Sequence, residues 1–299
     1  MPTSWIAPGS VERLVLTGDG GDEALAGYER FPATLLADHM RLPAQRGTGA
    51  MARQLPRSAS YHRLRRCLER FVGEPSRRVL DRYFSWIAAF GRGSLARVLT
   101  PELTQDASAS AFASYACEFE RAGDVGLLHR LLSLNLLRYL QDDLLVKTDR
   151  MPMANSLEAR SPFADTVLLE DLGALPPWMK ATPLGLKRVL PSALRYRLPR
   201  RILHRRKHGF GVPAGRWFGG ELRGPFEERV LDPGARTRET LQRGAAGALL
   251  DQHLSSRVDP GPRLWSLFVL QMWLRQLERP PTPGLPPHAD VAIAERNPS

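Results

Sequence analysis

The sequence predicts a mainly α fold with one short strand and a long, buried helix near its middle. Residues 14–16 (Leu-Val-Leu) are a short apolar run that stops at a glycine-rich turn, as a strand does before a turn. Residues 125–149 contain ten leucines at spacings that predict a helix buried on most sides. Residues 14–16 are the only clear strand that the pattern indicates, so we expect helices to dominate.

Helical periodicity recurs along the chain, separated by segments rich in proline and small residues. Apolar residues at helical spacing predict helices within residues 31–40, 61–72, 76–90 and 214–278. Thr100 followed by Pro101 predicts the start of another helix. The remaining stretches predict a loop at residues 1–12, a connection at residues 41–60, and a disordered tail with five prolines at residues 280–299.

Composition indicates a globular protein. The 299 residues are 43% hydrophobic, which suffices for one large domain or two small ones. The two cysteines, Cys67 and Cys117, give neither metal-ligand spacing nor a disulfide framework, so we expect a reducing cytoplasm. There is no secretory segment at the start, and the apolar residues 264–277 are too few to span a bilayer. We therefore expect no membrane partner.

The net charge of +11 suggests an acidic partner, and nucleic acid is the first candidate. The densest basic cluster, residues 195–207, contains a single aromatic residue, Tyr196, on which a base could stack. A solvated face or a contact with the polyphosphate of ATP is therefore the favoured interpretation, and nucleic acid is the less favoured one.

The turn after the strand has the sequence Thr-Gly-Asp-Gly-Gly-Asp-Glu, at residues 17–23. Its glycines let the backbone approach a ligand, and free N–H groups at a helix start favour an anion. Asp19, Asp22 and Glu23 would repel a bare phosphate, so a nucleotide here requires a bridging cation, most plausibly Mg²⁺. The alternative is an exposed turn in which Asp22 or Glu23 caps a helix.

The long apolar helix ends in polar residues. Lys147, Asp149 and Arg150 follow the leucines directly, and such a helix would bring them close to the centre of the fold. Buried charges are costly unless they are paired or bind something. Asp149 and Arg150 are therefore either site-supporting residues or members of internal ion pairs.

Together these motifs resemble the synthetase domain of glutamine-dependent asparagine synthetases. The resemblance rests on residues 18–28, residues 139–163, Lys187, residues 205–213 and residues 263–265, in the family's order. It covers most of residues 14–278, weakly between about 40 and 125. It implies that residues 1–279 are the C-terminal part of an α/β ATP-pyrophosphatase (adenine nucleotide alpha-hydrolase-like) domain.

Two family motifs do not occur in the sequence. The family's pyrophosphate loop, Ser-Gly-Gly-x-Asp-Ser, is absent, and Pro2 stands where its glutaminase domain has a catalytic cysteine. We therefore expect this chain to correspond to the C-terminal part of a longer enzyme, through truncation or a wrongly placed start. The missing N-terminal portion is then an expected partner, and the isolated chain is expected to be inactive.

The resemblance implies ATP-dependent amide formation on aspartate. ATP adenylates the side-chain carboxylate, and ammonia, derived from glutamine by the glutaminase domain, attacks the acyl-adenylate to give asparagine and AMP. The cofactors implied are ATP and Mg²⁺. The family's roles fall on matching positions, with Asp22 as metal ligand, Asp19 as base, Lys187 stabilising the oxyanion, and Thr17, Gly18 and Gly20 binding the nucleotide.

The Glu-Ala-Arg motif at residues 158–160 lies at the synthetase site in that family. This favours Glu158 and Arg160 as site-supporting residues, and the alternative is an internal salt bridge that fixes the turn. Some positions depart from the family. Asp19 is shorter than the glutamate that often stands there, and Pro152, Ser161 and Pro191 are unusual.

Two other functions remain open at the level of sequence. One is a non-catalytic remnant that binds another chain through an open sheet edge. The other is an RNA-modifying relative within the same ATP-pyrophosphatase superfamily, for which strongly salt-dependent tRNA binding would be diagnostic. The acceptor could also be a carboxylate other than aspartate.

Overall fold

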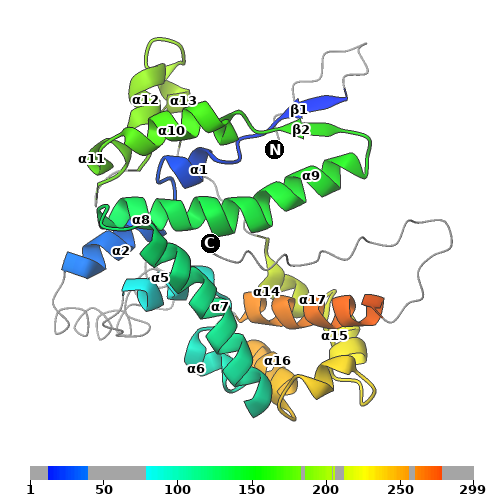
Figure 1. Cartoon of the computed structure of the whole chain (residues 1–299). Coiled ribbons are helices and arrows are strands. Elements are labelled where there is room, and N and C mark those ends of the chain that lie inside the picture. Colours follow the sequence, from blue (N-terminus) through cyan, green and yellow to red (C-terminus); the bar gives the residue numbers. More distant parts are fainter. Residues whose placement is uncertain are drawn as a thin grey trace, which may run out of the picture. The chain divides into compact units, whose positions relative to one another are not determined.

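The computed structural model describes residues 13–39, 79–182, 186–203, 205, 212–255 and 260–277 (Figure 1). Predictions for residues 1–12, 41–60, 61–72 and 280–299 lie outside these ranges. The chain forms two compact units. The first comprises Met1–Gly91 and Asp106–Gly209, and the second comprises Arg92–Gln105 and Phe210–Ser299. Helices dominate both units, so the prediction of a mainly α fold is confirmed.

The first unit combines two short strands with a series of helices. The strands are β1 (Leu14–Leu16) and β2 (Glu158–Arg160). The helices up to the long central one are α1 (Gly21–Ala24), α2 (Arg30–His39), α5 (Val79–Ile87) and α7 (Pro101–Arg121), of which α7 begins in the second unit. Those that follow the central helix are η2 (Pro162–Ala164), α10 (Thr166–Ala174), α11 (Pro177–Lys180), α12 (Val189–Leu194) and α13 (Arg200–Leu203).

The two strands pair in parallel, with Leu14 opposite Glu158 and Leu16 opposite Arg160. The prediction that residues 14–16 form the only clear strand is therefore wrong. Glu158–Arg160 has charged residues at both ends and no apolar run, so its extended conformation comes from pairing with β1 rather than from propensity. Because the strands are parallel, the residues after both of them meet at one edge of the sheet.

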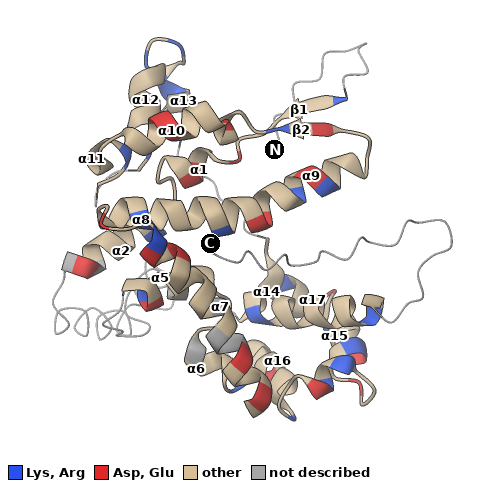
Figure 2. Ribbon diagram, in the orientation of Figure 1, with Lys and Arg blue, Asp and Glu red and all other residues tan. Residues whose placement is uncertain are grey.

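The central helix runs as three joined segments: α8 (Leu127–Leu134), the π-helix η1 (Asn135–Leu145) and α9 (Val146–Met153). Burial is confined to α8 and the first half of η1, and α9 has no buried residue. Charged residues become denser towards α9 (Figure 2). The expectation that Lys147, Asp149 and Arg150 lie near the centre is therefore wrong, because apolar density stops at Leu145 and the helix then leaves the core.

Two apolar clusters hold the first unit together. One joins α2, α5 and α8 through the fully buried side chains of Phe31, Tyr83 and Leu131. The other joins α1 to α10, and its buried members are Ala24 of α1, Leu25 directly after α1, and Leu172 of α10. The second cluster fixes the position of α1, the short helix that carries the acidic turn.

The second unit is helical. It contains α6 (Arg92–Leu95), α14 (Ala214–Phe218), α15 (Arg223–Val230), η3 (Arg236–Glu239), α16 (Ala245–Ser255) and α17 (Gly261–Leu277). Phe218 and Phe226 pack against Phe268 of α17, and the buried Gln271 accepts a hydrogen bond from the N–H of Thr237 at 2.9 Å. Among the described helices, none is long and apolar enough to cross a bilayer.

Candidate active site

The acidic turn joins β1 to α1 by a backbone conformation that only glycine adopts easily. Gly20 has a φ of 92°, and a Cβ atom there would lie 2.8 Å from the backbone carbonyl carbon and oxygen of Phe163. The N–H of Ala24 donates to the carbonyl oxygen of Gly20 at 2.9 Å, which starts α1. The strand–turn–helix order expected from the sequence is present, and the turn lies against the segment that follows β2.

Glu23 holds the turn from inside. Its side chain is 1% exposed and accepts hydrogen bonds from the N–H of Gly20, at 3.0 Å, and from the hydroxyl of Tyr28. Burial, together with the bond to Glu23, raises the pKa of Tyr28, so its hydroxyl remains a donor. Glu23 thus has the capping role that the alternative interpretation gave to Asp22 or Glu23, which leaves Asp19 and Asp22 for other contacts.

Asp22 forms an ion pair with Lys187, whose Nζ lies 2.6 Å from Asp22 Oδ1. Both side chains are about one quarter exposed. Gly27 makes room for the pair, since a Cβ atom there would lie 1.8 Å from Asp22 Oδ1 and 2.3 Å from Lys187 Cε. The pair therefore requires a residue without a side chain at position 27.

Lys187 lies just before a helix. Its φ of 49° is left-handed, and α12 begins two residues later at Val189. Pro191 is the third residue of α12, where a backbone N–H has no partner within the helix, so this proline is tolerated.

Asp19 accepts a hydrogen bond from the hydroxyl of Thr148 in α9 at 2.8 Å. Pro152, four residues after Thr148, has no N–H to donate to the Thr148 carbonyl, yet α9 continues to Met153. The contact brings the exposed end of the central helix to the acidic turn.

Thr17 links the ends of the two strands. Its hydroxyl lies 2.7 Å from that of Ser161, and its N–H donates to the carbonyl oxygen of Arg160 at 2.8 Å. Next to it, Gly18 is exposed, and a Cβ atom at this position would meet nothing within 4 Å. The backbone at Gly18 is therefore open to a ligand, whereas that at Gly20 is covered by Phe163.

The side chains of four predicted site residues form no hydrogen bond or ion pair with the turn in the described part of the chain. The guanidinium of Arg160 pairs with the carboxylate of Glu158, its Nε lying 2.5 Å from Glu158 Oε1, and both side chains are exposed. This is the internal salt bridge considered as the alternative for that motif. Asp149 and Arg150 are exposed on α9, and within the described ranges neither forms an ion pair.

The described residues contain no cluster of three acidic, histidine or cysteine side chains that could hold a metal. This does not conflict with a nucleotide-bound Mg²⁺, which proteins hold through one or two carboxylates while the phosphates supply further oxygens. Asp22 can be such a single ligand. In this structure the Asp22 carboxylate is paired with Lys187, so the described residues fit the metal only where a nucleotide supplies further ligands.

Three features that shape the site were not predicted from the sequence. They are the contact of Thr148 with Asp19, the burial of Glu23, and the contact of Phe163 with the turn. For Glu23 a signal was present, because a glutamate three residues after the Gly20 cap is the pattern of a capping box. Thr148 and Phe163 gave none, since each contacts the turn from a distant part of the chain.

Comparison with known proteins gives the family. The family model described as asparagine synthase matches residues 9–275. This range contains the parallel strand pair, the acidic turn and Lys187, and it exceeds half of the chain. The chain belongs to the asparagine synthase family.

Individual relatives of the chain are also named as asparagine synthetases. The chain is 32% identical over 270 residues to proteins named putative glutamine-hydrolysing asparagine synthetase from Mycobacterium bovis and Mycobacterium tuberculosis, covering 87% of this chain and 39% of theirs. It is 27% identical over 159 residues to glutamine-hydrolysing asparagine synthetase 1 from Bacillus subtilis, covering 52% of this chain and 24% of the relative. The chain thus spans about two fifths of the mycobacterial relatives it matches. No solved structure gives a significant match.

Proposed function

We propose that this chain carries the amide-forming site of an asparagine synthetase, acting on aspartate with ATP and with ammonia released from glutamine. The proposal rests on the ion pair between Lys187 and Asp22, together with the hydrogen bond that Thr148 donates to Asp19 of the same turn. Three distant segments meet there, next to the carboxyl ends of two parallel strands, where ligands bind in α/β proteins. We further propose that residues 1–279 form part of an ATP-pyrophosphatase domain in the cytoplasm.

In the first step of this proposal, an oxygen of the aspartate side chain attacks the α-phosphorus of ATP, and pyrophosphate leaves. Both reactants are anions, so positive charge must lie near the phosphates. Lys187 would supply one such charge, and Asp22 would hold Mg²⁺, which neutralises phosphate charge when bound. The open backbone at Gly18, with Thr17, would receive the nucleotide, and Gly20, which Phe163 covers, would act by holding the turn in shape.

In the second step, the nitrogen of ammonia attacks the acyl carbon, the bond to AMP breaks, and Asp19 takes a proton from the nitrogen. Thr148 would fix the orientation of the Asp19 carboxylate, which compensates for a shorter side chain at this position. Lys187 would oppose the negative charge that develops on the acyl oxygen. Glu158, Arg160, Asp149 and Arg150 would support the site from its exposed rim.

The test is release of AMP and pyrophosphate from ATP in the presence of aspartate, ammonium and Mg²⁺. The 299 residues contain no Ser-Gly-Gly, so we expect negligible turnover from the chain alone. We expect turnover when the chain is joined to the upstream segment of the Mycobacterium tuberculosis relative, and its loss in Asp19→Asn. A joined protein without turnover would refute the function, and turnover by the chain alone on the order of 1 per second would refute the need for the loop.

A non-catalytic, partner-binding role is the second candidate, and one observation favours it. In the described part of the chain the sheet has only β1 and β2, so each strand has an edge without a partner strand. Unpaired edges add strands from other chains. Tight binding of the relative's upstream segment, without AMP release under the conditions above, would favour this role.

A further inference from the structure

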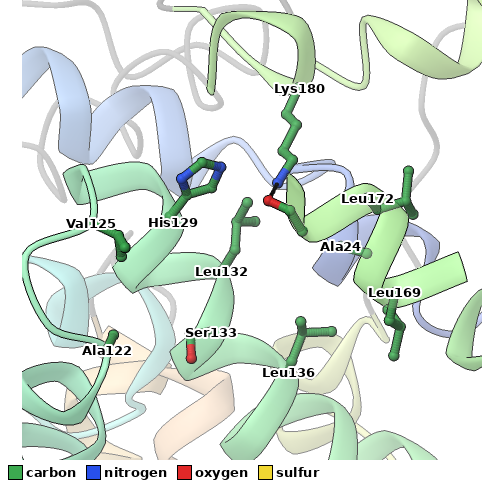
Figure 3. A pocket seen from close by; sticks show the side chains of 11 residues that line it. Ala24, Ala122, Val125, His129, Leu132, Ser133, Leu136, Leu169, Leu172 and Lys180 are labelled. Atoms are coloured by element: carbon green, nitrogen blue, oxygen red, sulfur yellow. Dashed lines mark hydrogen bonds between the residues drawn. The ribbon is translucent and has the colours of Figure 1, made fainter. Parts of the chain in front are cut away.

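A pocket of about 280 Å³ lies in the first unit, and its lining includes Ala24 of α1 but none of residues 17–23 of the acidic turn (Figure 3). Its walls are mainly leucine side chains, from α8, η1 and α10. These are Leu132, Leu136, Leu169 and Leu172. Two basic side chains, those of Lys180 and His129, also line the pocket.

Lys180 is almost fully buried, with 2% of its surface exposed. Its Nζ donates to the carbonyl oxygen of Gly173 at 3.4 Å, the one acceptor it has among the described residues. An ammonium group has three N–H donors, so this long bond leaves most of its hydrogen-bonding capacity unused. Burial lowers the pKa of Lys180 to about 8, the response expected of a charge with too little compensation.

Among the described residues that line the pocket, none is acidic. The Nε2 of His129 lies 3.0 Å from the carbonyl oxygen of Leu175, and burial together with the charge of Lys180 lowers the pKa of His129, which is therefore neutral at pH 7. Charged residues on the surrounding elements lie outside the described lining, and they include Asp22 and Glu23 on α1, Arg121 and Asp124 beside Ala122 and Val125, Arg130 on α8, Arg138 on η1, and Glu170 and Asp171 on α10. At pH 7 Lys180 is thus the only charged side chain among the described residues of the lining.

We propose that this pocket binds a small aliphatic monocarboxylate, with its carboxylate on Lys180 Nζ and its alkyl chain against the leucine walls. The volume corresponds to about nine groups of the size of a water molecule, at roughly 30 Å³ each, which is close to the size of a carboxylate with six carbons and two oxygens. A free amino acid fits poorly, because no acid is present to pair with its ammonium group. The ligand therefore differs from aspartate, and the proposal stands apart from the proposed function.

The probe is hexanoate, titrated into the 299-residue chain by calorimetry at pH 7, with hexan-1-ol and hexylammonium for comparison. A charge-assisted hydrogen bond in an apolar site predicts that hexanoate binds at least about tenfold more tightly than either. Because Lys180 loses its proton as pH rises through about 8, hexanoate should bind roughly 30-fold more weakly at pH 9.5 than at pH 7. Hexylammonium affinity equal to that of hexanoate, or an affinity independent of pH, would overturn the proposal.

Two variants locate the site. Lys180→Met keeps the length of the side chain without its charge and should weaken hexanoate at least about tenfold, whereas Lys147→Met, at an exposed lysine of α9, should bind as the parent does. Ser133→Phe keeps Lys180 but fills the pocket and should abolish binding. Circular dichroism checks folding of each. Undiminished binding by folded Lys180→Met or Ser133→Phe, or no binding by the parent chain, would show that Lys180 only caps the C-terminus of α10.

Discussion

Lys187 Nζ lies 2.6 Å from Asp22 Oδ1, and the lysine reaches this position from a left-handed backbone. A partly exposed ion pair contributes at most about 1 kcal/mol to stability. A left-handed conformation costs a residue with a side chain about 1–2 kcal/mol. The pair therefore does little for stability, and the conformation of Lys187 is retained at a net cost, as at many functional sites.

The first prediction separates the cost of the left-handed backbone at Lys187 from the effect of the lysine's charge. Lys187→Gly and Lys187→Ala both remove the ion pair, but only glycine is relieved of the left-handed strain. We expect Lys187→Gly to have the higher free energy of unfolding by about 1 kcal/mol, measured by urea denaturation.

The control is the same pair of substitutions at Lys147 within α9. There alanine should be the more stable by about 1 kcal/mol, because the backbone is helical. If alanine were the more stable variant at position 187 as well as at position 147, the left-handed conformation of Lys187 would be contradicted.

The second prediction concerns Thr148 as a positioning residue for Asp19. Thr148→Val removes the hydroxyl that donates to Asp19 and should lower kcat for amide formation in the joined protein by about 10- to 100-fold. Thr148→Ser retains the donor and should stay near the parent rate. Thr104→Val in α7, which removes a hydroxyl that donates to the carbonyl oxygen of Thr100 just before the helix, is the matched control. A parent-like rate in Thr148→Val would exclude this role.

The third prediction concerns the backbone at Gly20. Gly20→Ala adds both an unfavourable φ and a contact of 2.8 Å with Phe163, so it should destabilise the first unit by about 2–4 kcal/mol. Gly123→Ala has an unfavourable φ of 68° but meets no atom within 4 Å, and should cost about 1 kcal/mol. Gly18→Ala has neither effect and should change stability by less than about 0.5 kcal/mol. Thermal unfolding of the three variants would show whether this order holds.

The fourth prediction follows from Tyr28 and Glu23. The pKa of Tyr28 is raised in the folded state, so the folded chain holds this proton more tightly than the unfolded chain, whose tyrosine titrates near 10. The resulting stability is complete below pH 10 and is lost as pH rises above it.

Tyr28→Phe should be destabilised by about 1–3 kcal/mol at pH 8, because buried Glu23 loses a donor. The difference from the parent chain should shrink between pH 10 and 11.5 in urea denaturation. A difference that stays constant across this range would argue against the buried hydrogen bond.

The sequence was sufficient for local features of the fold. The strand at residues 14–16, the short helix after the turn and the helix at residues 127–145 each follow from apolar spacing or glycine chemistry within a short window. It was not sufficient for β2, because three residues with charged ends become a strand only through pairing with β1. Nor did it indicate the π-helical form of residues 135–145, since side-chain periodicity over so few residues does not distinguish the two helix types.

The candidate site shows the same division. Asp19, Asp22 and Lys187 were predicted from motifs, and the structure adds Asp22 as the partner of Lys187. Thr148 was missed because its contact with Asp19 spans 129 residues, and the burial of Glu23 was missed because acidic residues are expected at the surface. Asp149 and Arg150 were expected near the centre of the fold because they follow the leucine-rich stretch. That stretch ends at Leu145, and both residues are exposed.

The parallel pairing of β1 with β2 has a consequence for how the protein is made. A ribosome adds about 5–20 residues per second, so on the order of 10–30 s pass between emergence of the acidic turn and that of Lys187. During that time Leu14–Leu16 has no β2 to pair with, Asp19 has no Thr148 and Asp22 has no Lys187. The nascent chain therefore leaves the edge of β1 that later pairs with β2 open, and Asp19 and Asp22 without their partners, until most of the first unit has been translated, which is the interval in which we expect a chaperone to be needed most.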